Sequence, residues 1–211
     1  MAVGRFLLLL LLALVLARLP LIGLPLDWAE TFFHELSHGL VALFTGGQVE
    51  SLRLHLDGSG LCTFRGGWPF AAAFAGYAGA PLWGLAIFRL AGGGRILAGA
   101  LAVGVLLVML FWVRDPITLL IAGVLLTLFA LPLRWRPGGW LRSACEVLGL
   151  AVMLNALRAP TALFGNGIGD AAELARMSWI PASVWIVLWL AIALGCLWSA
   201  WRHARTLPAV R

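Results

Sequence analysis

Charged residues are scarce in this sequence: they make up 11% of its 211 residues, against about 25% in ordinary soluble domains. Hydrophobic residues make up 62%, and the mean hydropathy is +0.98. This shortage of charge excludes an ordinary soluble domain. It indicates instead that the natural surroundings of the chain are lipid.

Runs of basic residues and paired cysteine motifs are also lacking. The pI is about 10.9, but the arginines stand singly or in pairs at the ends of apolar runs, as topological anchors do. We therefore expect no nucleic-acid partner. The three cysteines, Cys62, Cys145 and Cys196, have no CxxC spacing, so we expect small buried core residues and no disulfide framework.

Long apolar segments fill most of the chain. About 20 apolar residues cross a bilayer as a helix, and the sequence predicts an all-α polytopic membrane protein with six or seven transmembrane helices. Residues 1–211 are expected to form a single membrane-embedded domain. We interpret the N-terminal run as a retained first membrane helix rather than a cleaved signal peptide. The segments lie at 6–26, 28–45, 68–90, 95–113, 116–133, 140–157 and 181–201.

Two stretches depart from this pattern. Residues 48–66 alternate leucine with polar residues and carry an Asp-Gly turn at Asp57, which predicts a β-hairpin. Residues 158–180 combine a glycine-rich loop with a short polar helix and are too polar to span a membrane easily. We expect both stretches to lie outside the membrane helices.

The chemistry concentrates in HELSH, residues 34–38. His34 and His38 are four residues apart, so on a helix their imidazoles project from one face and can bind one metal ion, in the HExxH arrangement of zinc peptidases. Glu35 lies beside that face, where a carboxylate can accept a proton from water activated by zinc. The alternative is a polar cluster that joins helices, or a proton relay without metal.

A catalytic zinc site usually has three protein ligands and keeps the fourth position for water, so another residue must join the two histidines. Asp57 begins the hairpin turn, and Asp115 fits a tight turn between helices. Asp170 follows a glycine-rich stretch and opens a short helix, which makes it the best candidate. On spacing alone, however, Asp170 and Glu173 are better interpreted as a helix-capping pair.

Other polar residues have structural interpretations beside functional ones. Asp27 and Glu30 are interpreted as interfacial residues that cap the helix start, with a role at the active site as the alternative. His55 is expected to be a solvated strand residue. Tyr77 is expected to anchor at the interface and Asn155 to bond to a neighbouring helix; both are also candidate substrate-binding residues, near an oxyanion or at a substrate carbonyl.

Three segments together resemble the bacterial, B-like branch of the site-2-protease-like zinc membrane metallopeptidases. They are HELSHGLVALFTGGQVESLRLHLDGSGLCTF at 34–64, FAGYAGAPLWG at 74–84 and GDAAELARMSWIPASVW at 169–185. The resemblance implies Asp170 as the third metal ligand. Asp57, although it lies in a Leu-Asp-Gly tripeptide, comes too soon after the histidines to match the ligand motif of site-2 proteases. The late NxxPxPxLDG motif and a PDZ insertion are both lacking, so substrate handling cannot be transferred from those enzymes.

The glycine-rich 74–84 segment is interpreted mainly as a packing surface, because Gly76, Ala80 and Gly84 recur every four residues and let another helix approach closely.

The resemblance implies an intramembrane zinc metallopeptidase that crosses the inner membrane of a bacterium several times. One zinc ion would be held by His34, His38 and Asp170, and Glu35 would act as general base toward a peptide bond of a membrane-associated protein or peptide. The alternative is a non-proteolytic scaffold, chaperone or regulator that keeps the metal. A transporter or proton relay is less favoured, because the sequence has neither inverted repeats nor paired broken helices.

Overall fold

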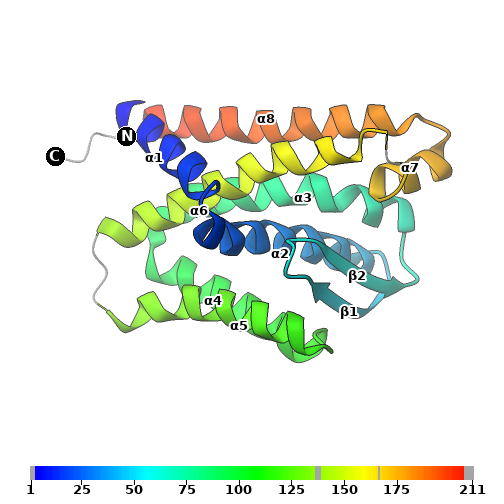
Figure 1. The fold of residues 1–211 in the computed structure, drawn as a ribbon, viewed down its shortest axis with the longest axis horizontal. Helices are drawn as coiled ribbons and strands as arrows, with labels where there is room; N and C mark the ends of the chain where they lie inside the picture. Colours follow the sequence, from blue (N-terminus) through cyan, green and yellow to red (C-terminus); the bar gives the residue numbers. More distant parts are fainter. Residues whose placement is uncertain (1–2, 136–138, 166, 207–211) are drawn as a thin grey trace.

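A computed structural model describes residues 3–135, 139–165 and 167–206. The described chain is mostly helical, with a single two-stranded hairpin. Figure 1 shows α3, α6 and α8 running beside one another, with α2 against α3 and the α4–α5 pair on the far side of α2. The elements are α1 (Val3–Leu16), α2 (Pro20–Phe44), β1 (Gln48–Leu54), β2 (Gly60–Arg65), α3 (Pro69–Leu90), η1 (Ala91–Gly93), α4 (Arg95–Phe111), α5 (Pro116–Ala130), η2 (Leu131–Arg134), α6 (Gly139–Arg158), η3 (Ala159–Leu163), α7 (Asp170–Ser178) and α8 (Ala182–Thr206).

The first apolar stretch is divided differently from our prediction. The helix axis bends by 104° between α1 and α2, before Pro20 rather than near residue 27. Proline has no amide hydrogen and disfavours helical dihedrals in the residue before it, and Leu19 is extended (φ −82°, ψ 122°). Asp27 and Glu30 therefore lie inside α2. The interpretation that they cap a helix start was wrong.

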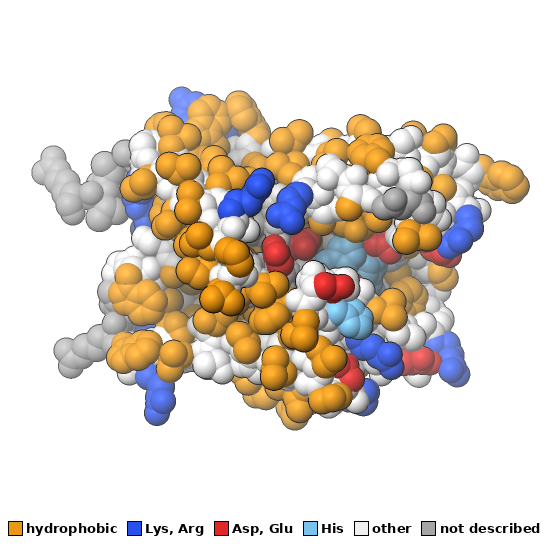
Figure 2. Space-filling view, viewed as in Figure 1, with side chains coloured by type: hydrophobic (Ala, Val, Ile, Leu, Met, Phe, Trp, Pro, Cys, Tyr) orange, Lys and Arg blue, Asp and Glu red, His pale blue; other side chains and the backbone are white. Residues whose placement is uncertain are grey.

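Several long apolar helices are consistent with a multi-pass membrane protein. Within the described residues, four helices are long and apolar enough to cross a membrane, or five if α1 and α2 form one bent span. The six or seven spans that we expected are not shown, because α1 and α2 are bent against each other and α4 has only 17 residues. Apolar side chains cover much of the outer surface (Figure 2).

Small residues let α3 pack closely on α6, as predicted for Gly84. A Cβ atom on Gly84 would lie 2.8 Å from the carbonyl oxygen of Gly149, and one on Gly149 would lie 2.6 Å from that of Gly84. Ala80 is fully buried in a cluster with Ala156 of α6 and Ala193 of α8. Small side chains thus let α3, α6 and α8 pack closely together.

The predicted hairpin is present, and one of its two edges is covered. Strands β1 and β2 are antiparallel, and Leu52 and Leu54 of β1 are buried in the core. On its outer edge, Leu52 donates its amide to the carbonyl of Trp112, and Leu54 donates to the hydroxyl of Thr118. The α4–α5 connection therefore occupies the β1 edge. The other edge of the hairpin, that of β2, lies next to α2.

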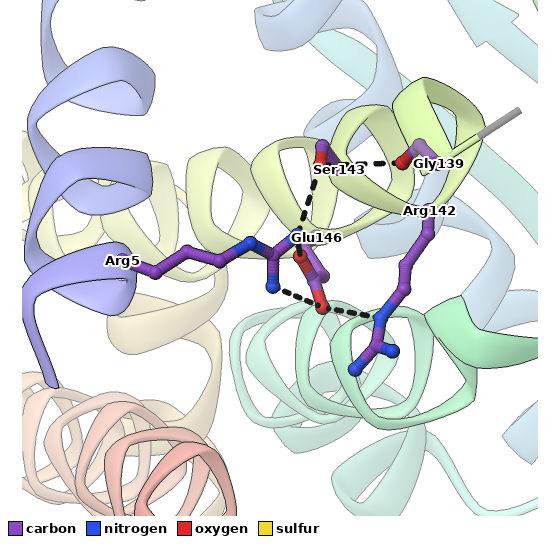
Figure 3. A network of polar contacts seen from close by, with 5 residues as sticks. All are labelled: Arg5, Gly139, Arg142, Ser143 and Glu146. Atoms are coloured by element: carbon purple, nitrogen blue, oxygen red, sulfur yellow. Dashed lines mark hydrogen bonds and ion pairs between the residues drawn. The ribbon is translucent and has the colours of Figure 1, made fainter. Parts of the chain in front are cut away.

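A buried carboxylate joins α1 to α6 at the opposite end of the bundle from the hairpin (Figures 1 and 3). Glu146 is 2% exposed; one of its oxygens lies 2.6 Å from Arg5 and the other 3.0 Å from Arg142. Arg5 also donates to the hydroxyl of Ser143 (2.9 Å). Two partly exposed guanidinium groups thus share one buried carboxylate.

Replacement of Glu146 by glutamine is expected to lower the free energy of unfolding by about 2 kcal/mol, because it leaves Arg5 and Arg142 without a counter-charge. Loss of one partner from a fully buried pair costs roughly 3–5 kcal/mol, and the expected loss is smaller here because both arginines are partly exposed. Thermal unfolding in detergent, followed by tryptophan fluorescence, should show a melting temperature lower by roughly 4–8 °C. The control is Glu50→Gln, which breaks an exposed pair with Arg65 and should change stability by less than about 1 kcal/mol. Equal shifts for the two variants would contradict the expectation.

Candidate metal centre

Helix α2 carries both histidines of HELSH on the face that meets α3. His34 and His38 lie one turn apart, and their Nε2 atoms are 3.0 Å from each other. His38 is buried and His34 is half-buried. This is the arrangement that the four-residue spacing predicts, with both rings directed to one point.

Asp170 reaches the same point from a distant part of the chain. It is the first residue of α7, and its Oδ2 atom lies 3.3 Å from the Nε2 atom of each histidine. The residue that precedes the helix is Gly169, whose φ of +81° suits glycine. Glu173 pairs with Arg176. The capping interpretation of Asp170 and Glu173 was therefore wrong, since neither side chain caps the helix.

The three side chains have the geometry of a metal site. One ligand atom from each of His34, His38 and Asp170 lies within 4.8 Å of the other two. Ligand atoms about 2.1 Å from a zinc ion, at tetrahedral angles, are about 3.4 Å apart, close to the separations of 3.0 and 3.3 Å observed here. Two imidazoles and a carboxylate are also donors that zinc accepts. The residues present fit a zinc ion.

The charge state of Asp170 agrees with a ligand role. Burial acts to raise the pKa of its carboxyl group, but the hydrogen bonds and charges of His34 and His38 outweigh that effect and hold the pKa below its ordinary value. Asp170 is therefore a carboxylate at neutral pH, and carboxylates bind divalent cations.

Helix α3 holds the rings in place. The Nδ1 atom of His38 lies 2.7 Å from the carbonyl oxygen of Ala72, so Nδ1 carries a proton, and Nε2 faces His34 and Asp170, where it would serve as the ligand atom once it has lost its own proton. The ring of Tyr77 packs edge-on against that of His34, with centroids 4.3 Å apart. A backbone carbonyl and an aromatic ring of the same helix thus orient the two histidines.

Gly76 is required where α3 crosses the histidines. A Cβ atom at this position would lie 2.4 Å from Nε2 of His38 and 2.7 Å from Cε1 of His34. The sequence predicted packing for Gly76, but its neighbour proves to be the pair of imidazole rings rather than another helix backbone.

The hairpin covers Glu35, the residue beside the histidines. The amide of Leu52 points away from β2, toward Trp112. In an antiparallel pair, two directly opposite residues either both point their amides at the partner strand or both point them away from it. Its facing residue Cys62 therefore turns its own amide away from β1, toward α2, where it interacts with the Glu35 carboxylate. A Cβ atom on Gly60 would lie 2.7 Å from Oε1 of Glu35. Strand β2 thus packs directly against a buried carboxyl group next to the candidate metal centre.

These groups face one cavity of about 620 Å³, lined by α2, β2, α3 and α7. Figure 2 shows histidine and acidic side chains gathered in a hollow of the surface. Cys62 also lines the cavity, but burial and the nearby Glu35 raise the pKa of its thiol to about 12. It is therefore a neutral thiol at physiological pH. All three cysteines are buried and free, as expected.

Most other candidate residues lie away from the three donor atoms. Asp57 is exposed and accepts hydrogen bonds from Ser59 in the hairpin turn, and Asp115 caps α5 by accepting from the amide of Thr118. His55 is exposed, as expected. Asn155 donates to Asp27 of α2, so it does bond to a neighbouring helix.

Sequence reasoning underrated Glu30. This residue is buried and borders the cavity one helical turn before His34. The signal was available in its four-residue spacing from His34, which places both side chains on one face of α2. Thr31, next to it, donates to the carbonyl of Gly58 and holds the hairpin turn against α2; nothing in the sequence pattern pointed to that contact.

A family model described as Peptidase M50B-like matches residues 7–200 of the chain. No curated protein and no solved structure matches it.

Proposed function

Because the chain belongs to the Peptidase M50B-like family, we propose that it is an intramembrane zinc metallopeptidase that hydrolyses a peptide bond of a membrane-associated protein or peptide. The observation that carries the proposal is the meeting of His34, His38 and Asp170 in one cavity with Glu35 beside them. Zinc is the typical metal of M50 peptidases, and the donor set suits it.

In this proposal, each residue has one task. His34, His38 and Asp170 would hold the ion, which supplies a Lewis acid that acidifies water and polarises the peptide carbonyl. Glu35 would accept the proton of the attacking water and pass it to the departing amine. The close packing of β2 at Gly60 would limit the movement of the Glu35 side chain during both transfers. The hydroxyl of Tyr77, whose ring packs against His34, would contact the developing oxyanion.

The substrate would bind in extended form along β2. A peptide bond inside a helix is shielded from attack, so a membrane substrate must unwind before cleavage. The β1 edge is covered by the α4–α5 connection, whereas β2 lines the cavity with Leu61, Cys62 and Phe64. An edge strand can hold an extended peptide by backbone hydrogen bonds. Asn155 of α6, which lines a pocket next to this cavity, would contact a substrate carbonyl.

We also propose the setting of this reaction, a multi-pass protein of the bacterial inner membrane. Six spans would result if the bent α1–α2 pair is one span and α4 crosses as well, since 17 residues is the lower limit for a membrane helix. The polar stretch of sequence at 158–180 and the hairpin would supply water to the site.

A scaffold or regulator that keeps the metal would need only the three ligands. The presence of a buried Glu35 carboxylate, held by β2 at the same cavity, favours hydrolysis over that alternative.

The test is to purify the full chain in detergent, measure its zinc content by mass spectrometry, and reconstitute it with a library of fluorogenic peptides derived from membrane segments. We expect one zinc ion per chain and cleavage that stops on chelation and resumes with added zinc. A protein without stoichiometric zinc would refute the proposal. Zinc without cleavage of any library member would favour the scaffold alternative.

Gly76→Ala is expected to weaken zinc binding by at least about tenfold. The new methyl group would occupy the space of the His38 and His34 rings and displace their nitrogen atoms, and metal affinity depends on ligand placement to within about 0.5 Å. A competitive titration with a chromophoric chelator measures the change. The control is Gly123→Ala on α5, where a Cβ atom meets nothing within 4 Å. Unchanged affinity in Gly76→Ala would show that the rings are not held as described.

A further inference from the structure

A second polar pocket adjoins the metal centre. It has a volume of about 320 Å³ and lies between α2, the hairpin turn and the end of α6. Glu30, Thr31, Gly58 and Ala159 border both this pocket and the larger cavity. A group seated in the smaller pocket would therefore be next to a peptide bound at the metal centre.

Glu30 is the residue that links the two spaces. Its side chain is 5% exposed, and its Oε1 atom has no hydrogen-bond partner within the described residues. Burial of a carboxylate without a partner is strongly unfavourable, and such groups are retained at membrane depth chiefly where they bind something. A cationic group from outside the protein would satisfy this oxygen atom.

The remaining charges of the pocket have mostly the same sign. Asp27 and Asp57 line it with Glu30, against one arginine, Arg158. Asp27 stands three residues before Glu30, hence on the same side of α2, and is oriented by the amide of Asn155. Across the described part of the chain, no ion pair joins Arg158 to Asp27 or Glu30. The pocket is acidic, and its innermost acid is unpaired.

We propose that this pocket is a specificity site for a basic side chain, lysine or arginine, of the substrate residue adjacent to the cleaved bond. The inference rests on the proposed peptidase function. A pocket of this size takes a long aliphatic stem and its charged head, and is far larger than a lone metal ion requires. The head group would donate to Glu30 and Asp27, and the stem would pass Thr31 and Gly58 from the larger cavity.

The experiment uses the zinc-loaded full chain in detergent and two pairs of peptide hydroxamates, one pair extending to each side of the zinc-binding group. Within each pair, the residue next to the hydroxamate is lysine or norleucine, which share a carbon stem and differ in charge. Dissociation constants are measured by microscale thermophoresis. In one pair, we expect the lysine compound to bind at least about tenfold tighter than its norleucine partner.

Two variants assign that preference. Glu30→Gln keeps the shape of the side chain and should bring the lysine compound to the affinity of the norleucine compound, while norleucine binding stays unchanged. Arg158→Gln removes the one cation of the pocket and should keep or increase the preference.

The proposal is overturned if both lysine compounds bind no better than their partners, or if the preference survives in Glu30→Gln. Failure of all four compounds to bind the zinc-loaded protein would instead refute the metal centre, and with it the proposed function.

Discussion

Replacement of Asp170 by alanine is expected to weaken zinc binding by at least about a hundredfold. Loss of a residue that merely supports a ligand already costs roughly 10–100-fold in affinity, and Asp170 would be a ligand itself, with its Oδ2 atom 3.3 Å from both imidazole nitrogens. The measurement is a competitive titration of the purified variant with a chromophoric chelator, together with the zinc content after dialysis.

Asp57→Ala is the matched control, because Asp57 is an aspartate of the hairpin turn that accepts hydrogen bonds only within that turn. Its zinc affinity should equal that of the parent protein. If Asp170→Ala holds zinc as tightly as the parent, Asp170 is not the third ligand. If Asp57→Ala loses zinc instead, the motif at residues 56–58 supplies a ligand after all.

Glu35→Gln is expected to retain zinc and to lose cleavage by a factor of about 10²–10⁴, the usual contribution of a general base. Glutamine preserves the shape of the buried side chain beside Gly60 but cannot accept the proton of the attacking water. Both quantities are measured on one preparation, zinc by mass spectrometry and cleavage with whichever library peptide the parent protein hydrolyses.

The comparison of Glu35→Gln with Asp170→Ala separates catalysis from metal binding. The first variant should lose only cleavage, and the second should lose both cleavage and metal. Cleavage at the parental rate by Glu35→Gln would show that another group takes the proton. Loss of zinc from Glu35→Gln would show that this carboxylate shapes the metal centre rather than the reaction.

The elements with strong local patterns could be predicted from the sequence. The hairpin follows from its alternating leucines and its Asp-Gly turn, and α3, α4, α5, α6 and α8 begin and end close to the apolar segments that predicted them. The break before Pro20 could not be predicted, because Pro25 is an equal candidate by sequence. In the structure Pro25 lies inside α2, whereas Pro20 begins it.

In the candidate site too, some features follow from local sequence patterns and others do not. The four-residue spacing of His34 and His38 suffices to bring their rings together. Asp170 follows more than a hundred residues later. Its position made it the best candidate for the third ligand, but spacing alone could not distinguish a ligand from a helix cap, and the family resemblance decided between the two. The role of Gly76 depends on how α3 crosses α2, a tertiary contact that no local pattern records.

The donor atoms of the candidate metal centre belong to two elements, α2 and α7, that are far apart along the chain. An ion held by both would therefore join α2 to α7 in the folded protein, and because the unfolded chain has no assembled site, the free energy of metal binding would add to the stability of the fold. The same tether fixes one wall of the cavity, because α7 borders it through Asp170 and Glu173. Binding of the metal would thus hold α7 in place as a wall of the cavity and also supply the Lewis acid for the proposed reaction.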